Sequence, residues 1–315
     1  MSYTEIIKKA KPNVSENTIK QYNFTLGKIG NLIGATPDKI APFKDLDKVR
    51  EAIEPLSNNT KKNYLSNIIV LLKAKETEEK IVDKFDKERQ KYVDIYEDGL
   101  NNGTKSDKQK ANWTNFEEIE KVRNMLQKEV HNAKIKTKVQ TGRITPADRK
   151  LYQDYLLVSL YTLLPPVRLD YGNMELVTNK EYEKLGDEKE FHNYLVMNGR
   201  KAFFSMNEYK TSHKYGEKKI DIPPKLLSII RSYMKINDTG FLLIDNRKKQ
   251  LTPNGITKHL TRIFHNHIGK KISAQMIRHI YLSTKYESVA EEMKKDADIM
   301  GHGEGMQKKY IKKSD

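Results

Sequence analysis

Apolar residues recur along much of this chain at alternating three- and four-residue spacing, the period of an amphipathic helix. The pattern first becomes regular between Ser15, which can cap the start of a helix, and Gly34, which can end one. A second helix with an apolar face is predicted to begin at about Ser57 or Asn59. The apolar positions of the first helix are Ile19, Tyr22, Leu26, Ile29 and Ile33.

Charge replaces this periodicity between Glu76 and Lys110, and the stretch ends in a segment rich in Gly and Asn. This composition predicts a charged helix followed by a flexible linker. Thr114 and Glu117 then have the spacing of a capping box at the start of another helix. We therefore predict one domain over residues 1–100, a linker over 101–112 and a second domain over 113–315.

The second domain mixes helices with short strands. A strongly apolar helix is predicted from about Asp148 to Leu164, and Pro165-Pro166 stops it. Strands are predicted over 194–197, 202–206 and 219–222, and later helices over 226–234, 252–264, 275–286 and 288–300. The predicted fold class is mainly α with a small antiparallel sheet (α+β).

The charge balance indicates which class of partner the protein binds. The 315 residues carry 58 Lys+Arg against 42 Asp+Glu, a net charge of +16 and a pI near 9.5. Residues 113–315 hold +12 of this excess. Such a balance favours a binder of nucleic-acid phosphates, with a well-solvated lysine-rich surface as the alternative.

Composition also excludes several classes. Cysteine is absent, which excludes disulfides and thiolate metal sites. We find no signal-peptide-like start and no apolar run long enough to span a membrane, so the expected location is intracellular, without membrane binding.

Four separated stretches of the second domain carry the candidate chemistry. Arg168 follows the Pro-Pro stop, Lys210 lies between two predicted strands, Arg278 follows Gln275, and His302 and Tyr310 lie near the end of the chain. In this order they resemble the tyrosine recombinase (phage integrase-type) family. The resemblance covers roughly residues 113–315, and it implies that the first domain is the helical, SAM-like core-binding domain of that family.

Elementary chemistry agrees with this resemblance. Charge accumulates on the non-bridging oxygens when a phosphodiester is attacked, and two planar guanidinium groups, here Arg168 and Arg278, can clamp those oxygens. A phenol with a pKa of about 10 is almost entirely protonated at neutral pH, so Tyr310 needs nearby cations to ionise. The resemblance implies that Tyr310 forms a 3′-phosphotyrosyl bond and that His302 hydrogen-bonds the cleaved phosphate. No cofactor or metal is expected.

Lysines of the predicted hairpin are the candidate general acids for the departing 5′ oxygen. Lys210 is the first choice, because a hairpin tip can enter the groove beside the cleaved bond, and Lys214 is its rival. His265 and His267 have a metal-like spacing, but without a third ligand nearby we interpret them as structural or DNA-contacting residues.

Two departures from the family pattern matter. Gln275 stands where the family usually has a histidine, so this position can donate a hydrogen bond but cannot shuttle a proton, and we expect Lys210 to carry more of the acid role. The spacing from His302 to Tyr310 is also one residue shorter than the commonest family spacing. Weaker candidates for phosphate contact are Gln275 and His279, and weaker candidates for DNA contact are Lys61, Lys62, Lys214, Lys258 and Arg262.

The sequence therefore predicts a site-specific DNA recombinase or integrase that grasps double-stranded DNA, and the resemblance implies a homotetramer on two DNA sites. A type IB DNA topoisomerase and a non-catalytic DNA-binding protein derived from a recombinase are the alternatives. The Lys- and Asn-rich composition and the Pro-Pro-x-Arg stretch resemble integrases of large eukaryotic DNA viruses or their mobile elements, which would place the protein in the host cytoplasm or nucleus.

Overall fold

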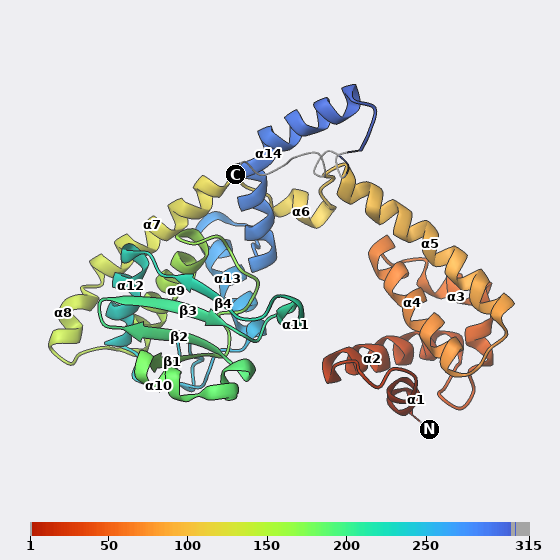
Figure 1. Ribbon diagram of the computed structural model, residues 1–315, viewed down its shortest axis with the longest axis horizontal. Coiled ribbons are helices and arrows are strands. Elements are labelled where there is room, and N and C mark those ends of the chain that lie inside the picture. Colours follow the sequence, from red (N-terminus) through yellow and green to blue (C-terminus); the bar gives the residue numbers. More distant parts are fainter. Residues whose placement is uncertain (1, 304–305, 307–315) are drawn as a thin grey trace. The chain divides into compact units, whose positions relative to one another are not determined.

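The computed structural model describes residues 2–303 and 306 (Figure 1). The chain divides into two compact units, Met1–Ser106 and Asp107–Asp315. The division lies inside the segment 101–112 that the sequence assigns to a linker. That segment is not wholly irregular, because its second half forms the short helix α6 (Asp107–Asn112).

The first unit is helical. Two predicted caps are confirmed: the Ser15 hydroxyl accepts a hydrogen bond from the Thr18 backbone at 3.3 Å, and Gly34 ends the helix in the left-handed region at φ 72°. Ser57 caps the other predicted helix in the same way, through Thr60. The elements are α1 (Tyr3–Ala10), α2 (Glu16–Ile33), the 3-10 helix η1 (Ala41–Lys44), α3 (Leu46–Ile53), α4 (Asn58–Ala74) and α5 (Glu79–Asn101).

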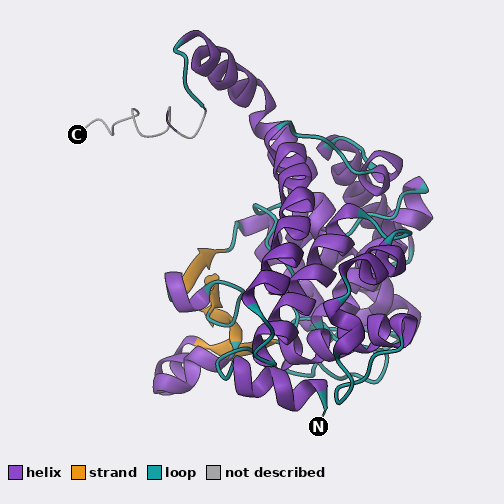
Figure 2. Ribbon diagram, turned by 90° about the vertical axis from the view of Figure 1, so that its right-hand side faces the viewer, coloured by secondary structure: helices purple, strands orange, loops and turns teal. Residues whose placement is uncertain are grey.

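The second unit is built around helix α9 (Pro146–Thr162), as the apolar stretch of the sequence predicts. Side chains on all sides of α9 are buried, and helices α7, α12 and α13 pack against it. Helix is the prevailing secondary structure, and the strands gather in one place (Figure 2). The other helices are α7 (Phe116–Asn132), α8 (Ile135–Gln140), α10 (Asn179–Lys184), η2 (Gly186–Phe191), α11 (Ser212–Tyr215), α12 (Pro224–Met234), α13 (Pro253–Ile268) and α14 (Ala274–Ile299).

One sheet accompanies these helices, in the strand order β1-β2-β3-β4. Its strands are β1 (Met174–Thr178), β2 (Asn193–Asn198), β3 (Lys201–Met206) and β4 (Lys218–Asp221). The predicted α+β class is confirmed. The predicted sheet was purely antiparallel with three strands, and this detail is wrong: β1 adds a fourth strand that runs parallel to β2. A parallel pair needs a crossover, which α10 and η2 supply.

Two further local predictions need correction. The start of α7 is capped by Asn115, which accepts a hydrogen bond from the Glu118 backbone at 2.8 Å, and not by Thr114. The two helices predicted over 275–286 and 288–300 form the single helix α14. No Gly or Pro interrupts the sequence between them, so the backbone hydrogen bonds continue.

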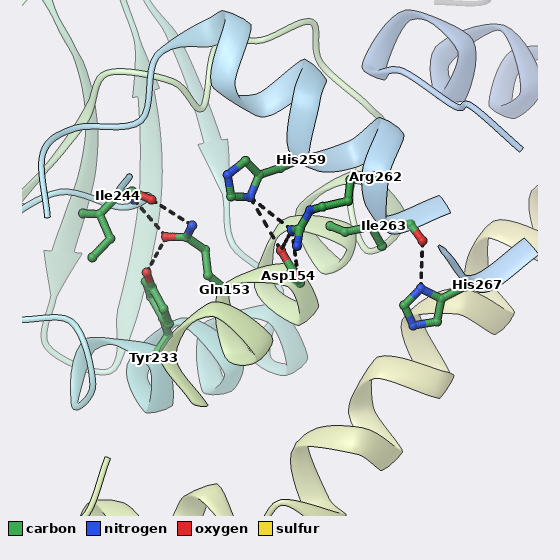
Figure 3. A network of polar contacts seen from close by, with 8 residues as sticks. All are labelled: Gln153, Asp154, Tyr233, Ile244, His259, Arg262, Ile263 and His267. Atoms are coloured by element: carbon green, nitrogen blue, oxygen red, sulfur yellow. Dashed lines mark hydrogen bonds and ion pairs between the residues drawn. The ribbon is translucent and has the colours of Figure 1, made fainter. Parts of the chain in front are cut away.

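A buried polar network ties the core elements of the second unit together (Figure 3). The side chain of Gln153 in α9 donates to the Ile244 carbonyl at 2.9 Å and accepts from the Ile244 backbone N–H at 2.9 Å. The hydroxyl of Tyr233 in α12 donates to the same amide at 2.6 Å. Each polar atom of the buried amide is therefore satisfied, which fixes α12 and the segment around Ile244 against α9.

In the part of the chain that the structure describes, the helices lack the uninterrupted apolar length that a bilayer crossing requires.

Candidate functional site

Arg168 lies in the loop that leaves α9. The helix ends at Thr162 and the following Pro165-Pro166 cannot continue it. The hydroxyl of Tyr161, itself fully buried, donates to the Arg168 carbonyl at 2.5 Å. This bond anchors the backbone of the loop to the core, while the Arg168 side chain is exposed.

Arg278 lies in the second turn of α14, about half-buried, in a stretch of the helix whose inner face packs against α7 and α13. Burial lowers the pKa of the Arg278 guanidinium, and the positive charge of Arg168 lowers it further. The two arginines are 110 positions apart in the sequence, yet the fold brings them within electrostatic reach of one another. The two arginines predicted to bind phosphate therefore influence one another electrostatically in the fold.

Asp170 lies within electrostatic reach of both arginines, and the sequence did not single it out. Burial raises the pKa of the Asp170 carboxyl, and the rise is countered in part by a hydrogen bond from the Arg168 backbone and by the charges of Arg168, Arg278 and Lys218. One partly buried carboxyl therefore lies among three cations, with a positive excess that suits an anion. Its position two residues after Arg168 in the same loop was the only signal in the sequence.

Gln275 holds Arg278 from the side. Its amide oxygen accepts a hydrogen bond from Arg278 Nη1 at 3.1 Å, and its Nε2 lies 3.0 Å from Nε2 of His279. An amide nitrogen donates, so His279 accepts with Nε2 and carries its proton on Nδ1. Gln275 thus orients an arginine, and the side chains of Gln275, Arg278 and His279 lie on one turn of α14.

The predicted hairpin is the connection between β3 and β4, which pair in antiparallel fashion. Lys210 lies exposed in this connection, before α11, and Lys214 Nζ lies 5.3 Å from the centre of the Tyr215 ring. Lys218, at the start of β4, is the hairpin lysine whose charge reaches Asp170. Its Nζ lies 4.6 Å from the centre of the Tyr209 ring, which orients the ammonium by a cation–π contact.

A short network anchors the end of this hairpin. The Ser205 hydroxyl donates to the Glu217 carboxylate at 2.7 Å, and the Tyr182 hydroxyl donates to the same oxygen. Burial and the hydrogen bond to Glu217 raise the pKa of Tyr182 to about 12, so this phenol stays protonated and keeps donating. Glu217 immediately precedes Lys218, and the network therefore fixes where β4 begins.

The structure does not bring His302 to the two arginines. Helix α14 has 26 residues, and the 21 steps from Arg278 to Ile299 span about 32 Å at about 1.5 Å each. His302 follows the far end of the helix, where its backbone N–H donates to the Ala297 carbonyl at 3.0 Å. Tyr310 lies outside the described residues. The roles predicted for His302 and Tyr310 stay predictions.

The lysines proposed at the start of α4 have partners within the first unit. Lys61 is largely buried, with its Nζ 3.0 Å from Glu54 Oε2. Lys62 Nζ lies 3.5 Å from the centre of the Tyr96 ring. The ion pair with Glu54 and the burial of Lys61 give this lysine a structural role that does not involve DNA. DNA contact by either lysine stays a prediction.

The candidates on α13 differ in their surroundings. Arg262 Nη2 lies 2.6 and 2.9 Å from the two carboxylate oxygens of Asp154, and His259 Nδ1 lies 3.6 Å from the first of them (Figure 3). Lys258 borders a cavity of about 420 Å³ together with His259 and Arg262. Arg262 therefore joins α13 to α9, and DNA contact by Lys258 or Arg262 stays a prediction.

Of the two histidines at the end of α13, His267 has structural partners, whereas His265 is exposed. His267 lies 2.8 Å from the Ile263 carbonyl through Nδ1 and 3.1 Å from Glu129 through Nε2. Within residues 2–303 and 306, the structure contains no group of three His, Asp or Glu side chains placed to hold a metal ion. His267 thus connects α13 to α7.

Comparison with known proteins adds little. No family model matches the sequence, and no curated protein matches it. The crystal structure of XerA recombinase is similar over 99% of this chain and 94% of that chain, at 12% sequence identity and a TM-score of 0.34. A likeness this distant says nothing about activity. The function therefore has to be argued from the arginine pair and its surroundings.

Proposed function

We propose that the second unit breaks and rejoins DNA strands as a tyrosine recombinase does, with double-stranded DNA as its partner. The observation that carries the proposal is the convergence of Arg168 and Arg278, which come from distant stretches of sequence and lie within electrostatic reach of one another. Like charges repel, so a fold that holds two guanidiniums together suits an anion that both can bind.

The geometry supports a phosphodiester as that anion. Arg168 and Arg278 would each donate hydrogen bonds to the non-bridging oxygens, where charge grows during attack at phosphorus. Asp170 accepts a hydrogen bond from the Arg168 backbone, and its single carboxyl cannot neutralise both arginines. Gln275 fixes the rotamer of Arg278 through the 3.1 Å hydrogen bond. The site would thus be organised before DNA binds, which is what electrostatic catalysis requires.

The bond changes follow from this arrangement. The Tyr310 oxygen attacks phosphorus, the new O–P bond forms as the bond to the 5′ oxygen breaks, and the phenolic proton passes to solvent water, which the positive field of the arginines favours. A hairpin ammonium, Lys210 or Lys218, protonates the departing 5′ oxygen. Reversal by another 5′ hydroxyl rejoins the strand, since the phosphotyrosyl bond conserves the energy. Recombination between two sites, as an integrase performs it, would use four protomers.

A covalent trapping assay tests the proposal. Duplexes carrying a nick beside randomised flanking sequence lose the short fragment that bears the new 5′ hydroxyl after cleavage, so rejoining is prevented and a covalent protein–DNA adduct accumulates. Wild-type protein should form the adduct, and Tyr310→Phe should form none while binding the same DNA. Binding without any adduct, over the full library of flanks, would refute the proposed enzyme.

A non-catalytic DNA-binding protein is the second candidate, and the position of His302 at the far end of α14 favours it over cleavage within a single chain. Such a protein binds the duplexes above with a steep salt dependence and forms no adduct. A type IB topoisomerase would form the adduct and relax supercoiled DNA as a monomer without recombinant products. The two assays together separate the three functions.

A further inference from the structure

A cavity of about 1190 Å³ lies beside α9, between α8 on one side and α12 on the other. Its lining residues all belong to α7, α8, α9, α12 and the positions next to them, so the second unit forms it alone. Figure 1 shows α8 at the end of this unit that lies opposite to α11 and to the beginning of α14. The cavity is therefore separate from the two arginines discussed above.

The buried residues of the lining form an apolar floor. Tyr152 and Tyr155 of α9 belong to it, and so do Ile135 of α8 and Ile229 of α12. All four side chains are at most 9% exposed. Burial raises the pKa of both phenols, so they stay protonated at neutral pH. A ligand gains most at such a floor by burying apolar groups of its own.

The exposed residues of the lining form a basic rim. Lys134 and Lys136 lie on the α8 side, and Lys225 and Lys235 lie on the α12 side. None of the 18 lining residues is Asp or Glu, and in the described part of the chain none of these four lysines forms an ion pair. By contrast, Lys138 in the same short helix as Lys136 has a carboxylate partner at 2.6 Å. The rim therefore offers two facing rows of cations to an anionic ligand.

The backbone at Lys134 also indicates that this rim binds something. Lys134 has φ 52° and ψ 35°, in the left-handed region that favours glycine. A glycine would turn the chain from α7 into α8 without strain, whereas a lysine holds this conformation at a cost in free energy. Backbone strain of this kind is typical of residues that contact a ligand, and the Lys134 side chain lines the cavity.

The basic rim continues along α12 into a smaller cavity of about 440 Å³. The two cavities share three residues, Lys235 among them, and the smaller one also borders Arg200 and Lys201. Its nine lining residues include four cations and no carboxylate. Lys225 and Lys235 are separated by ten positions, which corresponds to about 15 Å at about 1.5 Å per residue. The α12 side therefore offers positive charge over about three helical turns.

We propose that this cavity docks an amphipathic helix of a partner protein, with its apolar stripe on the floor and its acidic residues beside the two rows of lysines. An apolar floor between two basic rims matches a helix that has an apolar stripe and acidic flanks. The volume exceeds the roughly 300–1000 Å³ of sites for drug-sized ligands, and it suits side chains from several helical turns. Such docking is independent of the DNA chemistry proposed above.

DNA fits this cavity less well than an acidic helix does. Tyr152 and Tyr155 are 9% and 5% exposed, so neither offers the open ring face on which a nucleotide base stacks. The phosphates of a duplex would pair with the lysines of the rim but would leave the apolar floor without a partner. The end of the chain itself has the wrong charge for this rim, because its sequence from 307 to 315 holds four lysines and one acidic residue.

Binding of helical peptides to the full chain tests the docking. A display library presents a helix of about fourteen residues, with varied apolar residues at i, i+3, i+4 and i+7 and with Glu, Lys or Ser beside them. Selection on the wild-type protein should enrich Glu on both flanks, and the best peptide should bind with a micromolar Kd that rises with salt concentration. A library without any binder, or enrichment of Lys or Ser on the flanks, overturns the docking.

Matched charge variants show where the selected peptide binds. Lys136→Glu combined with Lys225→Glu should weaken binding by about tenfold or more, because each attraction becomes a repulsion. The same peptide made with Lys in place of Glu should bind this double variant more tightly than it binds the wild type. Lys128→Glu combined with Arg143→Glu changes the net charge equally at exposed positions outside the cavity, and it should change the Kd by less than about twofold. Equal losses in the two double variants would mean attraction to net charge alone and overturn the docking.

Two further variants separate docking from stability. Ser228→Trp fills the cavity from an exposed position of α12 and should abolish peptide binding while the buried core stays intact. Lys134→Gly removes a rim charge and relieves the left-handed backbone, so affinity should fall while Tm stays the same or rises. A lower Tm in every variant that loses affinity would mean unfolding and overturn the docking. Duplex DNA that displaces the peptide, together with weaker DNA binding by the Lys136→Glu, Lys225→Glu double variant, would assign the cavity to DNA instead.

Discussion

In its first two turns α14 buries Ile277 and Ile280 completely, whereas the next three turns leave Leu282, Tyr286 and Val289 about half exposed. The residue types are alike, and the helix is unbroken between them. The difference is burial: Ile277 and Ile280 belong to the hydrophobic core of the second unit, whereas Leu282, Tyr286 and Val289 stay outside that core. The beginning of α14 thus acts as a scaffold for Arg278, and its later turns expose apolar side chains.

The largest effect on covalent adduct formation should come from a substitution near the beginning of α14. Arg278→Ala removes one of the two guanidiniums that would bind the growing charge, and the rate of covalent adduct formation should fall by about 10³-fold or more. DNA binding should weaken far less, because many phosphates contribute to it. Arg143→Ala, an exposed arginine in the α8–α9 loop, is the matched control and should keep the wild-type rate. Equal loss in both variants would contradict the assignment of the site.

The effect of a substitution on the free energy of unfolding should differ between the buried and the exposed residues of α14. Ile280→Ala deletes fully buried atoms and should lower the free energy of unfolding by about 2–4 kcal/mol, whereas Val289→Ala should change it by less than about 0.5 kcal/mol in the monomer. Urea denaturation at low protein concentration measures both. Similar losses in the two variants would mean that the outer turns are packed within a single chain.

A smaller effect should follow from the hydrogen bond between Gln275 and Arg278. Gln275→Ala removes the hydrogen-bond acceptor of the Arg278 guanidinium. Adduct formation should slow by roughly five- to tenfold, because the net contribution of such a hydrogen bond is about 1 kcal/mol. The affinity for uncleaved DNA should stay near that of the wild type, and Gln275→Glu, which can still accept from Arg278, should recover part of the positioning. A loss confined to binding would show that Gln275 contacts DNA and does not position Arg278.

The smallest effect is a pH dependence of stability at Asp170. Burial raises the pKa of this carboxyl, so the folded chain holds the proton more tightly than the unfolded chain. Its contribution to stability is therefore fully present below the ordinary pKa of about 4 and is lost as the pH rises through the raised value. Asp170→Asn should remove this loss, so its stability relative to the wild type should increase with pH over that interval. A constant difference would contradict the direction of the shift.

Sequence reasoning succeeded where local chemistry decides the outcome. Ser15 and Gly34 bound α2 as their capping preferences require, and Pro165-Pro166 ends the chain's most buried helix. The charge of Arg168 acts on Arg278 in the fold, while the catalytic roles predicted for the two residues stay predictions. Each of these features follows from one residue's conformational or charge preference, which a single sequence contains.

Features that depend on contacts across the fold could not be predicted in this way. The surroundings of Asp170 include Arg278 and Lys218, which other segments contribute, and Lys218 becomes the hairpin lysine whose charge reaches Asp170 only through strand register. Strand β1 pairs with a strand beyond a crossover, so its short apolar run carried no signal of its own. The hydrogen bond from Arg278 to Gln275 likewise depends on rotamers that packing selects.

The most direct measurement of the central claim identifies the protein atom that becomes joined to DNA. Adduct trapped on the nicked duplexes is digested with protease and nuclease, and mass spectrometry locates the residual nucleotide on a peptide. The account predicts a 3′-phosphonucleotide on Tyr310, present with the wild type and absent with Arg278→Ala. A nucleotide joined to another residue, or no adduct under conditions where the chain binds these duplexes, would contradict it.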